Sequence, residues 1–495
     1  MKLLYIDLFC GAGGTSTGVE NARYEGRQCA KVIGCVNHDA NAIASHAANH
    51  PDALHFTEDI RTLELSPLTA HIAEMRRQYS DAFVVLWASL ECTNFSKAKG
   101  GQPRDADSRT LAEHLFRYIE AINPDYIQIE NVEEFMSWGD LDENGKPISK
   151  DAGRLYQQWV SNVCGYGYRF AHRILNSADY GAYTTRRRFF GIFAKGSLPI
   201  VFPEPTHSKD GATALFGQMQ RWKPVREVLD FSDEGRSIFG RKKPLVDATL
   251  ERIYAGLIKF VAGGKEAFLV KWNSMSSTGK YHAPSIDEPC PTVATQNRLG
   301  IAQVNFLSKH YGGSPAGKCV SVEEPAGTIT TWDHHSFITA YYGNGHNHSI
   351  DAPAPTLTTR DRLAFVDMQY GNGAPCDIES PAPTVTTNPK LQLVTCRMEQ
   401  QESTTTITSD DSPAMAKIKR FMALYGIVDI KMRMLRIPEL KRIMGFPPDY
   451  VLVGTQADQK KFIGNAVEVN MARVLCEALC ARLIEGDWRP TQIAA

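Results

Sequence analysis

The residues best suited to covalent chemistry are a cysteine and the polar loop that follows it. Cys92 comes just after an apolar run, Phe83–Ala88, and the loop behind it, Lys97–Gly101, is basic and contains glycine. A thiolate is a strong nucleophile, a loop of this kind can move, and its lysines can contact phosphates. A single cysteine is more often an inert buried thiol. The surrounding sequence therefore has to decide between the two interpretations.

A glycine-rich turn and a glutamate follow two other apolar runs. Leu3–Phe9 leads into Cys10–Gly14, where glycines allow a tight turn and let a ligand approach the backbone. Tyr126–Glu130 continues into the tripeptide Glu130-Asn131-Val132. Such a turn is also an ordinary connection from strand to helix, and a glutamate at a strand end is often a solvated surface group. Neither feature identifies a function alone.

The elements that must position these groups alternate between apolar runs and helical patterns over residues 1–200. This alternation predicts an α/β domain with a mostly parallel sheet. Ligands bind at the carboxyl ends of the strands in such sheets, which is where the informative residues cluster. The expected strands are Leu3–Phe9, Lys31–Val36, Phe83–Ala88 and Tyr126–Glu130, and the expected helices are Asn41–Asn49, Ser66–Tyr79, Thr110–Ile122 and Leu155–Cys164.

From about Val201 the sequence contains frequent prolines and glycines, and an internal repeat follows. Four similar segments rich in proline and threonine begin their threonine runs at Thr292, Thr328, Thr356 and Thr384. Proline followed by β-branched residues and a glycine turn predicts repeated strand or hairpin units at about 285–395. After a linker the pattern returns to a helix at Met415–Tyr425, a strand at Ile427–Leu435 and a closing helix at Asn470–Ile484.

Composition excludes several classes of protein. The chain has 495 residues, of which 43% are hydrophobic, and no apolar run approaches the length of a membrane span. Its eleven cysteines are scattered without CxxC pairs, which favours reduced thiols over a disulfide framework or a zinc site. The net charge of −1 leaves any phosphate-binding surface to local clusters. We therefore expect a cytoplasmic protein with no metal and no membrane contact.

The string DLFCGAGGTSTG at residues 7–18 closely resembles the first motif of cytosine-5 DNA methyltransferases. Further motifs of that family follow in order over about residues 1–200 and 433–480. The resemblance implies a Rossmann-like, S-adenosylmethionine-dependent methyltransferase domain at 1–200, completed by 436–495, with a smaller β-rich target-recognition domain at 201–435. The other matching segments are Phe95-Ser96, Glu130-Asn131-Val132, Asp179-Tyr180-Gly181 with Arg186 and Arg188, residues 436–450 (RIPELKRIMGFPPDY) and residues 462–467 (FIGNAV).

The same resemblance implies S-adenosylmethionine as the cofactor. One position departs from the family, because Asn37 stands where an acidic residue normally binds the ribose hydroxyls. Asparagine can still hydrogen-bond a hydroxyl, without the assistance of a charge. The residues implied to contact the cofactor are Asp7, Phe9, Gly11, Gly13, Asn37, Asp59, Leu111 and Asn465.

Four residues are implied to act on a cytosine. Cys92 would add to ring carbon C6, and a protonated Glu130 would relieve the charge at ring nitrogen N3. Arg186 would contact the cytosine O2, and Arg188 would help to position the glutamate or the backbone. Three neighbours depart from the family pattern, in which proline and two glutamines are usual: Glu91, Thr93 and Thr184.

The expected partner is double-stranded DNA, bound by a monomer. A role beside a cognate restriction endonuclease and a role in protecting mobile DNA both stay open. Ser96, Lys97 and Lys99 lie in the loop expected to close over a flipped base. Asn297, Arg298 and Arg362 lie at repeat tips and are candidates for base readout, although such residues are also common in plain turns.

Two alternatives remain open. One is an RNA cytosine-5 methyltransferase, against which the insert of roughly 230 residues argues. The other is a DNA-binding homologue that has lost catalysis, against which the retention of Cys92, Glu130 and both arginines argues.

Overall fold

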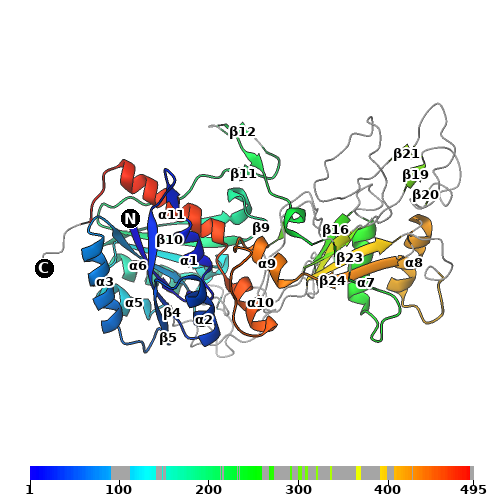
Figure 1. The fold of residues 1–495 in the computed structure, drawn as a ribbon, viewed down its shortest axis with the longest axis horizontal. Helices are drawn as coiled ribbons and strands as arrows, with labels where there is room; N and C mark the ends of the chain where they lie inside the picture. The colour runs from blue at the N-terminus through cyan, green and yellow to red at the C-terminus, as the bar shows by residue number, and fades with distance from the viewer. Residues whose placement is uncertain are drawn as a thin grey trace. The chain divides into compact units, whose positions relative to one another are not determined.

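The computed structural model describes residues 1–90, 112–140, 148, 152–211, most of 213–258, short strand segments between 267 and 397, and most of 406–490. The chain forms two compact units (Figure 1). Unit 1 comprises residues 1–221 and 444–495, and unit 2 comprises residues 222–443. The sequence predicts boundaries near 200 and 435. In the structure, residues 201–221 belong to unit 1 and residues 436–443 belong to unit 2.

Unit 1 is built on a seven-stranded sheet with the strand order β5-β4-β1-β6-β7-β10-β8. The first five of these strands pair in parallel, and β10 pairs antiparallel with both β7 and β8. This is the mostly parallel α/β sheet that the sequence predicts. The strands are β1 (Leu3–Leu8), β4 (Ala30–Asn37), β5 (Leu54–Thr57), β6 (Phe83–Ser89), β7 (Tyr126–Asn131), β8 (Tyr168–Asn176) and β10 (Arg187–Lys195).

The central strands are apolar on both faces because helices cover both sides of the sheet. All six residues of β1 are buried, and Leu4 and Ile6 belong to a different core cluster from Leu3 and Tyr5. Successive side chains of a strand point to opposite faces, so a strand between two helical layers has no polar side. A continuous apolar run is therefore the correct signature for these strands.

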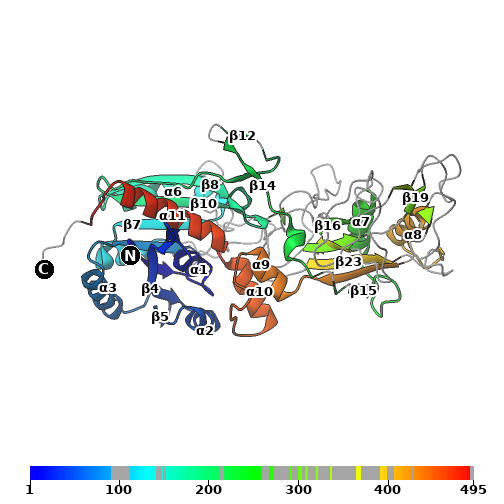
Figure 2. The same cartoon turned by 45° about the horizontal axis from the view of Figure 1, so that its top comes forward.

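Each face of the sheet has its own set of helices (Figures 1 and 2). One core cluster contains buried residues of α3 (Ser66–Gln78), α5 (Leu115–Ile122) and α6 (Arg154–Cys164). The other contains residues of α1 (Gly14–Glu20), α2 (Ala40–Asn49) and α11 (Val469–Glu485). The expected helices are present, although the described part of α5 begins at Leu115, after a turn at residues 112–114. A further helix, α10 (Gln456–Asn465), precedes α11.

Helices α1 and α11 approach closely because Gly18 has no side chain. A Cβ atom added at Gly18 would lie 2.6 Å from the Cβ of Ala472 and would also overlap the carbonyl of Val469. Any larger residue would push the two helices apart. The last helix of the chain is thus locked against the helix that follows the first strand.

Unit 2 contains a six-stranded sheet with the order β15-β24-β23-β22-β18-β16, together with two longer helices, α7 and α8. Most pairs are antiparallel, and β18 pairs parallel with β23. The β-rich character expected for the middle of the chain is present in these segments. The elements are β15 (Arg236–Ser237), α7 (Asp247–Gly256), β16 (Ala267–Lys271), β18 (Leu299–Gln303), β22 (Ala364–Met368), β23 (Leu391–Arg397), α8 (Pro413–Tyr425), β24 (Asp429–Met434) and α9 (Ile437–Ile443).

Unit 2 also holds a buried ion pair at the start of α9. Glu439 accepts two hydrogen bonds of 2.8 Å from the Arg433 guanidinium, and it also accepts the backbone N–H groups of Asp230 and Arg436. All lone pairs of the carboxylate are used, which is what makes a buried charge tolerable. The four threonine runs of the repeat lie outside the described residues.

No helix in the described ranges combines the length and the apolar character needed to cross a bilayer.

Candidate functional site

The turn after β1 is open to a ligand on one side and packed on the other. Phe9 and Gly11 both have positive φ, at 60° and 53°, and a Cβ at Gly11 would meet no atom within 4 Å. Gly13, at φ 99°, instead faces the protein, because a Cβ there would overlap the Tyr450 hydroxyl and lie 3.2 Å from His46. The two glycines therefore serve different needs: Gly11 leaves room beside the backbone, and Gly13 allows close packing.

Asp7 lies beneath this turn and is almost fully buried. Its Oδ2 accepts a 2.7 Å hydrogen bond from the Ser16 hydroxyl, whereas its Oδ1 has no hydrogen-bond partner among the described residues. Burial raises the pKa of Asp7 to about 7, and the hydrogen bonds from Ser16 oppose the rise. A carboxyl group with one unsatisfied buried oxygen has capacity for a donor from a ligand.

Two other residues implied to contact the cofactor follow the neighbouring strands. Asn37 ends β4, where its side-chain oxygen accepts the backbone N–H of Asp39 at 2.9 Å. Asp59 comes two residues after β5, and its carboxylate pairs with Arg61 at 2.7 Å; hydrogen bonding to Arg61 lowers its pKa. Because β5, β4 and β1 are adjacent and parallel, these residues lie at the same edge of the sheet as the glycine turn.

Glu130 lies at the carboxyl end of β7 and is 6% exposed. It pairs in register with Ser89, the last residue of β6, and its Oε1 lies 3.3 Å from the Arg188 Nε. Burial raises the pKa of Glu130, while Arg188, Arg186 and a hydrogen bond with Ser89 act in the opposite direction. The result is a carboxyl group that takes up a proton more readily than an exposed glutamate and is held in place by an arginine.

Three consecutive arginines, Arg186 to Arg188, stand at the start of β10, and their side chains face different ways. Arg186 is 3% exposed and donates a 3.1 Å hydrogen bond from Nη1 to the Gly464 carbonyl, in the segment that carries the last motif. Arg187 points to solvent, where it pairs with Glu133 at 2.8 Å. Only Arg186 and Arg188 are turned toward the interior, in agreement with the alternation of a strand. Asn465, next to Gly464, is exposed.

The end of β6 is tethered to β7 just before the cysteine loop. Asn131 donates a hydrogen bond of 3.4 Å from Nδ2 to the carbonyl of Leu90, the last described residue before the loop. The Trp87 indole N–H also donates to the Ser89 hydroxyl at 2.9 Å. The approach to the loop is therefore fixed. The remaining site residues lie outside the described residues: Cys92, Ser96, Lys97, Lys99, Leu111, Asn297, Arg298 and Arg362.

Three residues of the site region are not among the site residues that the sequence predicts. Ser16 supports Asp7, Ser89 faces Glu130, and Glu468 caps the start of α11 by accepting the backbone N–H groups of residues 470 and 471. Burial raises the pKa of Glu468 to about 7. Ser16 and Ser89 adjoin recognised motifs, which is a usable signal. Glu468 depends on how the C-terminal segment packs, and nothing in the local sequence reports that.

Comparison with known proteins agrees with this architecture. A model of the family described as C-5 cytosine-specific DNA methylase matches residues 3–221 and 324–481, which is more than half of the chain. The type II methyltransferase M.AgeI of Thalassovita gelatinovora is 29% identical over 203 residues, covering 41% of this chain and 42% of that protein. M1.HphI of Haemophilus parahaemolyticus, also a type II methyltransferase, is 27% identical over 211 residues, covering 42% and 50%.

The chain therefore matches no more than about half the length of these two relatives. Among solved structures, the methyltransferase EhMeth of Entamoeba histolytica aligns over 98% of this chain and 99% of its own, at 12% identity and a TM-score of 0.44. The extent of the family match decides the assignment. This chain belongs to the C-5 cytosine-specific DNA methylase family.

Proposed function

We propose that the protein transfers a methyl group from S-adenosylmethionine to carbon C5 of cytosine in duplex DNA. The observation that carries the proposal is the buried Glu130, which is held by Arg188 at the end of the strand next to β6. A family match alone would also fit a chain that has lost its chemistry. A buried carboxyl group whose pKa is raised by burial is what a general acid requires.

The glycine turn and Asp7 fit a cofactor at the carboxyl edge of the sheet. S-adenosylmethionine, when bound there, supplies an electrophilic methyl group on a sulfonium. The open space beside Gly11 gives it room, and the free Oδ1 of Asp7 can accept a hydrogen bond. Asn37 and Asp59 would hold its ribose and adenine, because they follow the two adjacent strands.

Cys92 would provide the nucleophile that makes C5 reactive. Its thiolate adds to C6, the C5–C6 double bond is lost, and the displaced electron pair is stabilised as N3 takes a proton from Glu130. C5 would then have enamine character and could take the methyl group, leaving S-adenosylhomocysteine. Loss of the C5 proton to a base and return of the N3 proton to Glu130 would restore the ring and expel the thiolate. General-acid assistance of this kind contributes about 10²–10⁴-fold to the rate.

These atoms cannot be reached inside a duplex, so the cytosine would have to rotate out of the helix at a cost of a few kcal/mol. The loop with Ser96, Lys97 and Lys99 would close over it and contact phosphates. Unit 2 would choose the DNA sequence, with Asn297, Arg298 and Arg362 as candidate contacts. The type II names of the two relatives support a restriction endonuclease as partner; a monomeric state and a cytoplasmic location complete the proposal.

The test has two stages. The chain is first expressed in cells without cytosine methylation, and sequencing of methylated sites identifies its target. A duplex with 5-fluorocytosine at that target is then incubated with the protein and S-adenosylmethionine. Because fluorine cannot leave as a proton does, we expect a stable protein–DNA adduct that survives denaturing electrophoresis.

The matched controls are two cysteine variants. C92A should bind the duplex but form no adduct, whereas C164A, at the half-buried end of α6, should behave as the unsubstituted protein. Substantial turnover by C92A would disprove the mechanism. Methyl transfer to structured RNA in preference to DNA would instead support the RNA alternative. DNA binding without any methylated site would indicate a homologue that has lost catalysis.

A further inference from the structure

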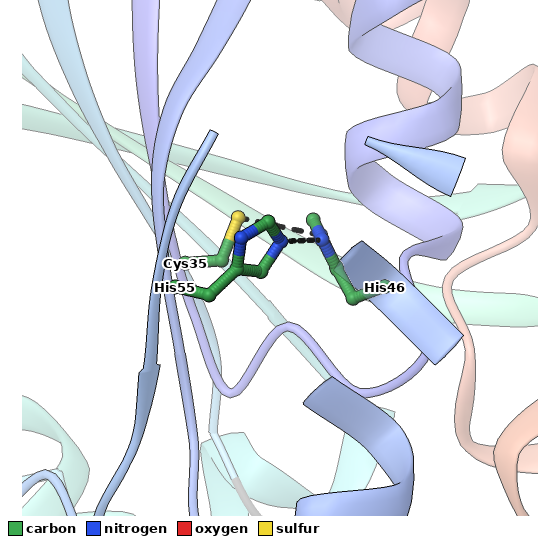
Figure 3. A group of neighbouring side chains, drawn as sticks. All are labelled: Cys35, His46 and His55. Atoms are coloured by element: carbon green, nitrogen blue, oxygen red, sulfur yellow. Dashed lines mark hydrogen bonds between the residues drawn. The ribbon is translucent and has the colours of Figure 1, made fainter. Parts of the chain in front are cut away.

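Three potential metal-binding side chains from three separate elements point toward one another behind the glycine turn (Figure 3). Cys35 lies on β4, His46 on α2 and His55 on β5. One ligand atom from each residue lies within 4.8 Å of the other two. Sequence patterns do not reveal this group, because its members are not arranged in a short metal-binding motif.

The three ligand atoms lie near one another but must draw closer together to share one ion. The His46 Nδ1 lies 2.9 Å from the His55 Nε2, whereas the Cys35 Sγ lies 3.3 Å from the other nitrogen of His46, Nε2. Zinc bonds of about 2.3 Å to sulfur and about 2.0–2.1 Å to nitrogen place neighbouring ligand atoms roughly 3.3–3.6 Å apart. Because Cys35 and His55 contact different nitrogens of His46, the Cys35 side chain would have to turn toward Nδ1 for the three residues to share one ion.

The surroundings keep both imidazoles in the form that binds metals. Burial lowers the pKa of His46 well below its ordinary value, and burial also lowers the pKa of His55. Both rings are therefore neutral near pH 7. The hydrogen shared between the His46 Nδ1 and the His55 Nε2 would move to the other nitrogen of His55 on metal binding. Cys35 is fully buried next to them and would lose its thiol proton on binding.

The other nitrogen of His46 already has the kind of partner that metal-bound histidines have. The His46 Nε2 lies 2.9 Å from the Ser16 hydroxyl oxygen, and that hydroxyl donates its own proton to Asp7 at 2.7 Å. The Ser16 oxygen must then accept a hydrogen from Nε2, which leaves Nδ1, the atom facing His55, with its lone pair. A histidine oriented through its second nitrogen by a polar group is the usual arrangement at a metal site.

We propose that Cys35, His46 and His55 bind one divalent cation of the zinc class, with water in the fourth position. The half-buried His55 provides the side from which the ion and the water enter. A set of one thiolate and two imidazoles selects zinc or a similar borderline-soft ion over magnesium or calcium. The ion would tie β4, α2 and β5 together and stiffen the turn at Gly13, where a Cβ would lie only 3.2 Å from His46.

The experiment uses the full-length chain without an affinity tag. The protein is stripped with a chelator, titrated with Co²⁺ under reducing conditions, and then back-titrated with Zn²⁺. We expect one equivalent of Co²⁺ to bind with a sulfur-to-metal charge-transfer band and with the visible bands of tetrahedral coordination. Zinc should abolish both sets of bands. The melting temperature should rise with Zn²⁺ and not with Mg²⁺.

Variants identify the ligands. C35S should lose the charge-transfer band, and H55N, at a half-buried position that the fold tolerates more easily, should weaken binding by about tenfold or more. C164S removes one thiol elsewhere in unit 1, as a matched control, and should bind the metal normally. The proposal is overturned if folded H55N, verified by circular dichroism, binds as tightly as the unsubstituted protein. It is equally overturned if no stoichiometric band forms, which would mean that hydrogen bonds alone satisfy the three side chains.

Discussion

Glu130 is subject to two opposing influences, and their balance decides its chemistry. Burial raises its pKa, and Arg188 at 3.3 Å lowers it. An arginine so close to a free carboxylate would normally keep it ionised, so the net rise reflects how completely the group is removed from water. The same contact fixes the direction of the side chain. Glu130 is thereby available as a proton donor in one orientation.

Replacing this carboxyl group by an amide tests its role. E130Q keeps the size of the side chain but cannot deliver a proton, so we expect kcat to fall by about 10²–10⁴-fold. Binding of DNA and cofactor should remain. E133Q, three residues away at an exposed pair with Arg187, is the control and should keep its activity. Equal activity of E130Q and the parent would remove Glu130 from the mechanism. Methyl transfer is measured with labelled cofactor.

Asp7 should make the stability of unit 1 depend on pH. The folded chain holds its proton up to about pH 7, whereas an unfolded aspartate releases it near pH 3.9. The unfolding free energy therefore falls as the pH rises between these values, by up to about 4 kcal/mol at 1.36 kcal/mol per pKa unit. D7N has no proton to lose. Its melting temperature relative to the parent should rise from pH 5 to about pH 7 and then level off.

The difference between the two proteins is the relevant quantity, because other groups act as well. Burial lowers the pKa of His50 to about 4, which destabilises the fold in acid, and Glu468 acts in the same direction as Asp7. D52N, at an exposed surface pair with Lys31, is the control and should show no such trend. A constant offset between D7N and the parent would contradict the prediction. Thermal scans at several pH values provide the measurement.

At this scale the sequence predicts which residues matter better than how they are connected. The motif strings name Glu130, Arg188 and Asp7, and the predicted strands Leu3–Phe9 and Tyr126–Glu130 contain two of these residues. They do not report that Ser16 links Asp7 to His46, since that contact joins α1 to α2. A side-chain network depends on the rotation of each helix over the sheet. Local sequence patterns carry no such information.

At the scale of elements, the ion pair at the start of α9 is the clearest structural device in unit 2. Glu439 and Arg433 are both largely buried, and the carboxylate also holds two backbone N–H groups. Removing one member leaves the other as a buried charge without its main partner. The segment 436–450 was recognised only as a motif string. Its structural role in holding β24 and α9 together emerges from the contacts.

E439A should therefore destabilise unit 2 strongly. Loss of a buried ion-pair partner costs about 3–5 kcal/mol, reduced here because Asp233 also lies 3.2 Å from Arg433. E251A removes an exposed pair with Lys417 and should cost about 1 kcal/mol or less. Chemical denaturation of both variants measures the difference. Equal denaturation midpoints for E439A and E251A would show that the buried ion pair stabilises unit 2 no more than the exposed pair does.

Elements were predictable where a single physical signal decides them. The buried strands β1, β4, β6 and β7 consist mostly of apolar residues, and the predicted bounds differ from the observed ones by a residue or two. Strand β8 was missed because polar residues such as Arg169, His172 and Arg173 interrupt it at the sheet edge. An edge strand has one neighbour and more solvent, so its pattern is weaker.

At the scale of the whole molecule, unit 1 is assembled from both ends of the sequence. Helix α11 contributes Met471, Leu475 and Leu479 to the core cluster that contains Leu3 and Tyr5 of the first strand. The sequence resemblance implied that the C-terminal segment completes the first domain. The position of each residue on the sheet face could not be read from it, because long-range packing is set by the register between distant segments.

A single core residue of α11 should therefore stabilise the first strand. L479A removes a fully buried side chain and should cost about 2–5 kcal/mol. Hydrogen exchange of the β1 amides, Leu3–Leu8, should accelerate in this variant. R482A, at an exposed position on the same helix, should leave exchange in β1 unchanged. Unaltered β1 protection in L479A would mean that the helix is not part of the same cooperative unit.

This split construction has a consequence during synthesis on the ribosome. The last strand of the sheet ends at Lys195 and α11 ends at Glu485, so about 290 residues must be translated between them. At roughly 5–20 residues per second, that interval lasts on the order of 15–60 s. Throughout it, the part of one apolar sheet face that α11 covers stays exposed while unit 2 is synthesised. Chaperones that shield exposed hydrophobic surface should therefore matter more for this chain than for one whose domains finish in order.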